Sequence, residues 1–154
     1  MKLAAFRKAI GVAVIVCGAL IVTASPAAAA TYDNVNPEGS ACQNTATTVR
    51  SAVPHNNIGD HAGLVELRYS TACRTVWARV TGGKGDRDHA DPHAKIHRNS
   101  DGKTLENTSA NRATHCNSLR TVCWTSMLND AGVTSYAWGG IDVLVFLQAQ
   151  TSSF

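Results

Sequence analysis

Apolar and polar side chains alternate with a period of two along the middle of the chain. In residues 65–70 (VELRYS) every second side chain is apolar, and residues 75–81 (TVWARVT) repeat the pattern. Such alternation is typical of strands that bury one face. Residues 45–53 are rich in threonine and valine, which favours a third strand over a helix. The Gly- and Asp-rich stretch 82–91 ends the second strand and is expected to form a long loop.

The C-terminal half of the chain continues in the same manner. Residues 94–98 and 103–107 flank the turn-forming sequence Asn99–Gly102, so they are expected to pair as a hairpin. Residues 143–147 are apolar on both faces of the last strand, which predicts a central position for that strand in its sheet. The remaining strands and turns are expected at 119–128, 133–138 and 141–151, with turns at Asn129–Asp130 and Gly139–Gly140.

The fold class follows from these patterns and from the length. No stretch after residue 30 shows the 3.6-residue period of an amphipathic helix. A chain of 154 residues suits one domain with its own core. The sequence therefore predicts an all-β protein, a small antiparallel sandwich or barrel-like domain that is cross-linked by two disulfides and preceded by a signal peptide.

The first 30 residues have the organisation of a secretory signal peptide. Three cations in Met1–Lys8 precede 13 apolar or small residues, Ile10–Val22, and this run is shorter than the roughly 20 residues that a membrane span needs. A run of alanines then favours cleavage between Ala30 and Thr31. We therefore expect residues 1–30 to direct export and to be removed.

The expected mature chain, residues 31–154, is a single secreted β-domain that lies outside the cell and has no membrane span. Three of the 14 Lys and Arg residues (Lys2, Arg7 and Lys8) lie in the signal peptide, and none of the 11 Asp and Glu residues does. The remaining 11 bases balance the 11 acids, so the mature chain has no formal net charge when its histidines are neutral. Its overall electrostatics therefore give no argument for binding a nucleic acid or an anionic membrane.

Export changes the interpretation of the cysteines. Cys42, Cys73, Cys116 and Cys123 remain after cleavage, and an even number in an oxidising compartment favours disulfides. Three connectivities are open. Cys116 and Cys123 enclose a short segment and are favoured as one pair, which leaves Cys42 and Cys73 as the other. The alternative is a catalytic thiolate at Cys116 beside His115, but adjacency in sequence does not by itself create a thiolate–imidazole pair.

Several segments together resemble a known family. They are the stretch from Tyr32–Asp33 through Pro37 to Cys42, VELRYS at 65–70, CRTVWARV at 73–80, the spacing of Cys116 and Cys123, and the pairs Trp124–Thr125 and Tyr136–Ala137. On these residues the chain resembles the YjfA-like family of small exported Gram-positive proteins, largely actinobacterial, which is a domain of unknown function. The resemblance implies an exported domain with two disulfides, and it implies no reaction.

Three histidines spaced by four residues, His89, His93 and His97, are the candidate metal ligands. On one helix their imidazoles would share a face and could bind zinc or copper. Pro92 would interrupt such a helix, and the neighbouring Gly and Asp residues favour a solvated loop. We therefore expect no cofactor, and a metal site at these histidines is the weaker alternative.

Two groups of side chains are candidates for a binding surface. The aromatic group could stack on a sugar or a base and comprises Tyr69, Trp77, Trp124, Tyr136 and Trp138. Packing in the core and across strands is the competing explanation for it. The charged group comprises Glu66, Arg68, Arg74 and Arg79. A glutamate opposite an arginine predicts a cross-strand ion pair rather than a catalytic acid.

No GxSxG, HExxH, Walker or dinucleotide-binding motif is present in the chain. The leading hypothesis is a secreted, non-catalytic domain for surface recognition, with an unknown partner in the extracellular space or the cell envelope. The first alternative is a small secreted hydrolase whose His, Asp and Glu residues converge from distant strands. The second alternative is a secreted protease inhibitor. Its candidate loop is Asn117–Val122, enclosed by two cysteines, although the pattern of this segment favours a strand.

Overall fold

The computed structural model describes residues 32–154 except for 60–61, 83–90, 108–109, 118 and 143–144. The expected signal peptide, residues 1–30, and its cleavage site between Ala30 and Thr31 lie outside the described residues. No helix in the part of the chain that is described is long and apolar enough to cross a membrane.

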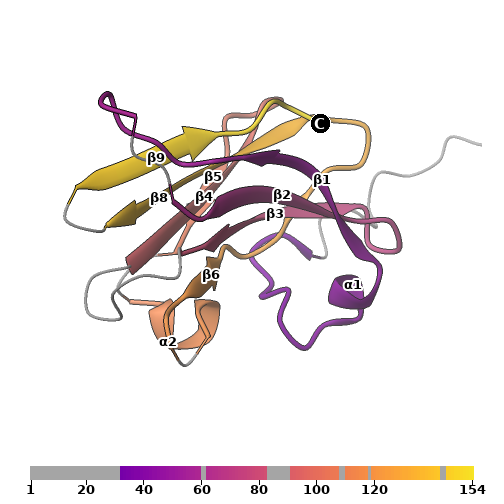
Figure 1. Ribbon diagram of the computed structural model, residues 1–154. Coiled ribbons are helices and arrows are strands. Elements are labelled where there is room, and N and C mark those ends of the chain that lie inside the picture. Colours follow the sequence, from indigo (N-terminus) through magenta and orange to yellow (C-terminus); the bar gives the residue numbers. More distant parts are fainter. Residues whose placement is uncertain (1–31, 60–61, 83–90, 108–109, 118, 143–144) are drawn as a thin grey trace, which may run out of the picture.

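Two antiparallel sheets pack face to face in a sandwich (Figure 1). The first sheet has the order β1-β2-β3-β6, with β7 also pairing with β3. Its strands are β1 (Ala46–Ala52), β2 (Leu64–Ser70), β3 (Thr75–Thr81), β6 (Val122–Trp124) and β7 (Leu128–Asn129). The second sheet has the order β5-β4-β8-β9. Its strands are β4 (Asp91–Arg98), β5 (Thr104–Glu106), β8 (Ser135–Asp142) and β9 (Phe146–Gln150).

The main core lies between the two sheets because alternate residues of each strand point inward. The inward residues include Val65, Leu67, Val76, Ala78, Val80, Ala94, Ile96, Ala137 and Ile141, all of which are buried. The side chains between them in the sequence point outward, away from the opposite sheet. The sandwich therefore has two outer faces, and these faces carry the candidate sites.

A second, smaller apolar cluster lies on the outer face of the first sheet. Trp77 on β3 packs there with Met127 and Cys42. The short helix α1 (Ala41–Asn44) covers this cluster, and a second short helix, α2 (Arg112–His115), precedes β6. The N-terminal part of the described chain therefore folds over one outer face of the sandwich.

Both favoured disulfides are present, Cys42–Cys73 and Cys116–Cys123. The first attaches α1 to the turn between β2 and β3. The second joins α2 to β6, so Cys116 is not a catalytic thiolate in this fold.

An ion-pair network attaches the N-terminal segment to the β4–β5 hairpin. The carboxylate of Asp33 accepts hydrogen bonds from Lys103 Nζ at 2.8 Å and from Arg98 Nη1 at 3.2 Å. Arg98 also pairs with Asp101 in the hairpin turn at 2.7 Å. These contacts hold the segment that precedes α1 against the second sheet.

Several expected elements are confirmed. Strands β1, β2 and β3 fall within one residue of the segments with alternating or β-branched residues. The hairpin around Asn99–Gly102 is formed by β4 and β5, and Gly102 has the positive φ of 72° that suits a tight turn. The fold class, an all-β antiparallel sandwich cross-linked by two disulfides, is confirmed.

The expected turn at Gly139–Gly140 is wrong, because β8 runs continuously through both glycines. A Cβ at Gly139 would collide with the side chain of Val80 in the opposite sheet. A Cβ at Gly140 would collide with the ring of Phe146 on the outer face. Glycine is therefore needed here for close packing on both faces of one strand, and the chain does not turn.

Two further strand expectations are corrected. The last strand is β9 at the edge of its sheet, since it pairs with β8 on one side and meets only an isolated bridge from His55 on the other in the described chain. The expected strand 119–128 is interrupted, because only β6 and the first residue of β7 fall within it. Leu119, expected in that strand, is 75% exposed.

Candidate functional site

Glu66 is the centre of an ion-pair network on the outer face of the first sheet. It lies on β2 directly opposite Arg79 on β3. Arg79 donates from Nε and Nη2 to the two carboxylate oxygens, at 2.6 and 2.8 Å. The hydroxyl group of Thr48 on β1 donates a hydrogen bond to Oε1 of Glu66 at 2.6 Å. The cross-strand ion pair expected from the sequence is confirmed.

The protonation state of Glu66 follows from these partners. Burial alone would raise the pKa of its carboxyl group, but the hydrogen bonds from Arg79 and Thr48 hold that pKa below its ordinary value. The side chain is therefore ionised at neutral pH, and both of its oxygens accept hydrogen bonds. This is not the state of a general acid.

Arg68 brings a second positive charge to the same place. Its Nη1 donates to Thr48 Oγ1 at 2.6 Å, and its Nη2 donates to the carbonyl of Ala46 at 2.9 Å. Burial lowers the pKa of Arg68, and the charge of Arg79 lowers it further. Two guanidiniums thus share one carboxylate, which leaves one positive charge in excess. Arg74 does not join them, because it is exposed in the turn between β2 and β3.

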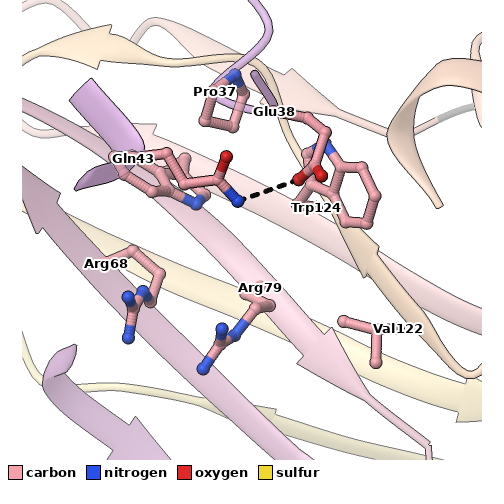
Figure 2. A pocket seen from close by; sticks show the side chains of 8 residues that line it. Pro37, Glu38, Gln43, Arg68, Arg79, Val122 and Trp124 are labelled. Atoms are coloured by element: carbon pink, nitrogen blue, oxygen red, sulfur yellow. Dashed lines mark hydrogen bonds between the residues drawn. The ribbon is translucent and has the colours of Figure 1, made fainter. Parts of the chain in front are cut away.

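A pocket with a volume of about 120 Å³ opens beside the two guanidiniums. Figure 2 shows Glu38 and Gln43 on one side of the pocket and Arg68 and Arg79 on the opposite side. We call this the arginine pocket, and its lining residues are Pro37, Glu38, Gln43, Arg68, Trp77, Arg79, Val122 and Trp124.

The rim of the arginine pocket is positioned by local contacts of the N-terminal segment. Gln43 on α1 donates from Nε2 to Oε2 of Glu38 at 3.0 Å, and its Oε1 accepts from the Gly39 N–H at 3.1 Å. The indole N–H of Trp124 donates to Asn36 Oδ1 at 2.9 Å. The Cys42–Cys73 disulfide fixes α1 itself on the sheet. The pocket therefore depends on the segment that covers the outer face.

The outer face of the second sheet carries a different set of residues. Because Ala94, Ile96, Ala137 and Ile141 point into the core, their neighbours along β4 and β8 point outward. We call this surface the aromatic face, and it comprises His93, Lys95, His97, Tyr136, Trp138 and Phe146, with Glu106 beside Lys95.

Ring contacts connect the residues of the aromatic face. The Trp138 and Phe146 rings lie 6.0 Å apart between centroids, and Nζ of Lys95 lies 5.6 Å from the centroid of the Trp138 ring. Lys95 also pairs with Glu106 at 3.4 Å. These side chains, with His93, line a hollow of about 250 Å³. The hollow thus combines apolar ring surfaces with one cation and one anion.

The candidate metal ligands do not come together. His93 and His97 both lie on strand β4, where residues four apart are separated by about 13 Å. His97 stacks on Tyr136 with ring centroids 4.8 Å apart, and His93 contacts Phe146 edge-on at 6.0 Å. His89 lies outside the described residues. Among the residues that are described, no three His, Cys, Asp or Glu side chains are grouped as metal ligands would be.

His115 is buried beside Ser126, not beside a carboxylate. Its Nε2 lies 2.9 Å from Ser126 Oγ, and its Nδ1 lies 2.9 Å from Thr114 Oγ1. Thr114 in turn donates to the carbonyl of Asn111 at 3.0 Å. Since that carbonyl only accepts, the hydroxyl of Thr114 accepts from Nδ1 of His115. Neither His115 nor Ser126 lines the two cavities described above.

Asp130 is a buried carboxylate whose surroundings disfavour its ionised form. Asp130 is 6% exposed, and its Oδ1 accepts a hydrogen bond from Ser135 Oγ at 2.7 Å. Burial raises the pKa of Asp130 to about 6, against the opposing effects of the Ser135 hydrogen bond and the charge of Arg98. The ionised form therefore destabilises the folded protein at neutral pH.

Replacing Asp130 with asparagine is expected to raise the free energy of unfolding at pH 7 by about 2 kcal/mol. The pKa of Asp130 is higher in the folded protein than in the unfolded chain. The free energy of unfolding of the wild type therefore falls as the pH rises from about 4 to about 6. Asparagine keeps the acceptor for Ser135 and has no charge to bury. Urea unfolding at pH 3.5 and pH 7.5 measures the effect, which should be small at the lower pH. The exposed Asp142→Asn variant is the control, and an equal gain there would contradict the explanation.

Some residues of these sites were not found from the sequence. The aromatic group is divided: Tyr136 and Trp138 lie on the aromatic face, Trp77 and Trp124 line the arginine pocket, and Tyr69 packs on Phe154. Glu38, Gln43, Lys95, Glu106 and Phe146 were not singled out. The pairing of Lys95 with Glu106 could have been read from the expected hairpin, because the two residues are cross-strand partners.

Comparison with known proteins identifies a family but no activity. The family model described as "Protein of unknown function (DUF2690)" matches residues 30–138. The uncharacterized protein YjfA of Bacillus subtilis (strain 168) is 33% identical over 137 residues, which cover 87% of each of the two chains. No solved structure matches the chain significantly. The resemblance to the YjfA-like domain of unknown function is thereby confirmed, while the export that it implies stays a prediction.

Proposed function

The chain belongs to the DUF2690 family of proteins of unknown function, and on that premise we propose that it is an exported domain that recognises saccharides through its aromatic face. Export is supported by the signal-like first 30 residues and by two disulfides, which persist in oxidising compartments. The ligand would then lie outside the cell or in its envelope, as the leading sequence hypothesis expects.

The observation that carries this proposal is the hollow beside Trp138 and Phe146. A pyranose ring has apolar C–H faces that stack on aromatic rings and an edge of hydroxyls that need hydrogen-bond partners. Phe146 is 44% exposed although it is large and apolar, so its ring is available to a ligand. Lys95 and Glu106 supply a charged donor and a charged acceptor next to the rings. Apolar walls with a few polar groups are typical of small-ligand sites.

Trp138→Ala is expected to weaken the binding of a saccharide at least tenfold, because it removes the central ring of the aromatic face. The probes are soluble oligomers of glucose and of N-acetylglucosamine, with binding measured by isothermal titration calorimetry, which does not depend on the indole that the variant removes. Phe146→Ala should weaken binding as well. Phe154→Ala is the matched control, since Phe154 is 37% exposed but packs on Tyr69 away from this face. Binding that is absent, or equally weakened by Phe154→Ala, would overturn the proposal.

The two alternative functions receive less support from the geometry. For a hydrolase, Glu66 is ionised and held by Arg79, and His115 contacts Ser126 away from both cavities. For an inhibitor, the candidate loop has a turn-type hydrogen bond, because the Arg120 N–H bonds back to the Asn117 carbonyl at 2.9 Å. Arg120 also has a left-handed φ of 51°. A protease cleft binds an extended strand, so this turn is a poor substrate mimic.

A further inference from the structure

We propose that the arginine pocket binds a small zwitterion of the amino-acid type, with its carboxylate at Arg68 and Arg79 and its ammonium group at Glu38. This site lies on the outer face of the first sheet and does not depend on saccharide binding by the second. The proposal rests on the charges that face the pocket, on the partners those charges lack, and on the walls between them.

The cationic side of the pocket contains N–H donors that the described part of the protein does not use. Arg79 uses Nε and Nη2 for Glu66, and within the described residues no acceptor lies within hydrogen-bond distance of its Nη1. The Arg79 side chain is 37% exposed, and it lines the pocket. Arg68 lines the same pocket, and the single carboxylate of Glu66 cannot neutralise both guanidiniums. A ligand carboxylate would supply the missing negative charge and accept from the planar donor groups.

The opposite side of the pocket is anionic. Figure 2 shows the carboxylate of Glu38 beside Gln43, separated from the guanidiniums by the open space of the pocket. Glu38 accepts one hydrogen bond there, from Gln43. As far as the chain is described, no ion pair within 4.0 Å joins Glu38 to Arg68 or Arg79. Opposite charges thus line the same pocket without meeting, and this pattern complements a dipolar ligand.

The size and the walls of the pocket restrict the ligand further. A volume of about 120 Å³ accommodates a molecule of only a few non-hydrogen atoms. Trp77 and Trp124 form apolar walls, and Val122 adds an aliphatic surface. These walls give the ligand an apolar surface to contact between the two charged sides. Glycine and alanine have the required size and both charges.

The experiment uses glycine, acetate and methylammonium as probes. Each is titrated into the purified protein while the three tryptophan indole N–H signals are followed by NMR. The signal of Trp124 should shift with glycine, because its N–H bonds Asn36 at the rim of the pocket, whereas the signal of Trp138 should not. Glycine should bind more tightly than either singly charged probe, with a dissociation constant in the millimolar range that suits so few atoms.

Glu38→Gln is the decisive variant because it removes a charge from the exposed rim and keeps an oxygen for Gln43. It should weaken glycine binding about fivefold, the size of one exposed ion pair. The same change should strengthen acetate binding, since a repelling carboxylate is gone. The exposed Asp142→Asn variant on the other sheet lines neither cavity, so it is the control and should change neither. The proposal is overturned if glycine does not bind, if acetate binds as tightly as glycine, or if Glu38→Gln affects both probes in the same direction.

Discussion

Gly63→Ala is expected to lower the free energy of unfolding by about 4 kcal/mol, because two costs coincide at this position. Gly63 has a φ of 70°, a conformation that a residue with a Cβ adopts with strain. An added Cβ would also overlap the backbone carbonyl oxygen of Thr81 and the side chain of Ile141. A backbone atom of a paired strand cannot move aside, so the strand pairing itself would have to shift.

The steric part of this effect can be isolated with a second glycine. Gly102 has a φ of 72°, yet an added Cβ there meets nothing within 4 Å. Gly102→Ala should therefore show only the strain, about 1 kcal/mol. Urea unfolding of both variants and the wild type measures the difference. If the two variants lost the same stability, the close approach of Gly63 to Thr81 would not be what requires glycine.

Removing the Cys42–Cys73 disulfide by a double replacement with serine is expected to cost about 3.7 kcal/mol, because the bond closes a long loop in the unfolded chain. The two cysteines are separated by 31 residues, compared with 7 for Cys116 and Cys123. The same loop-entropy relation gives about 2.5 kcal/mol for the shorter loop. Cys42 is also buried against Trp77, so its replacement by a polar residue adds to the loss.

The test is which of the two disulfides costs more unfolding free energy when it is removed. Denaturant unfolding of each double-serine variant, without reductant, gives the two losses under the same conditions. A larger loss for the Cys116–Cys123 pair would contradict the loop-entropy explanation. The Cys42–Cys73 variant should also lose the glycine response of Trp124, because α1 with Gln43 would no longer be attached to the sheet.

Strand alternation was sufficient to predict β2 and β3 of the first sheet. Residues 65–70 and 75–81 pair in antiparallel fashion, and the expected ion pair of Glu66 with an arginine forms with Arg79. The reason is physical: one face of each strand packs on the core, so the period of two is visible in the sequence. The cysteine pairing followed from the short spacing of Cys116 and Cys123.

The features that the sequence did not predict depend on contacts between distant segments. Gly139–Gly140 resembles a turn, but the pair allows close packing of Val80 from the opposite sheet and of Phe146 on the outer face. The last strand was expected at the centre because it is apolar on both faces. Its apolar outer residue, Phe146, is instead partly exposed on the aromatic face at a sheet edge. The position of Glu38 could not be predicted, because a folded segment and a disulfide bring it to the sheet.

The separation of the two outer faces of the sandwich determines how many ligands the domain can hold at once. The arginine pocket opens from the first sheet and the aromatic face belongs to the second, with the main core between them. A molecule of the size of an amino acid or a monosaccharide cannot span this core. Glycine and a saccharide should therefore not compete, and a ligand immobilised on one side leaves the other side open. If both proposed sites are occupied, the domain has a valence of two and would bridge a glycan to a second molecule.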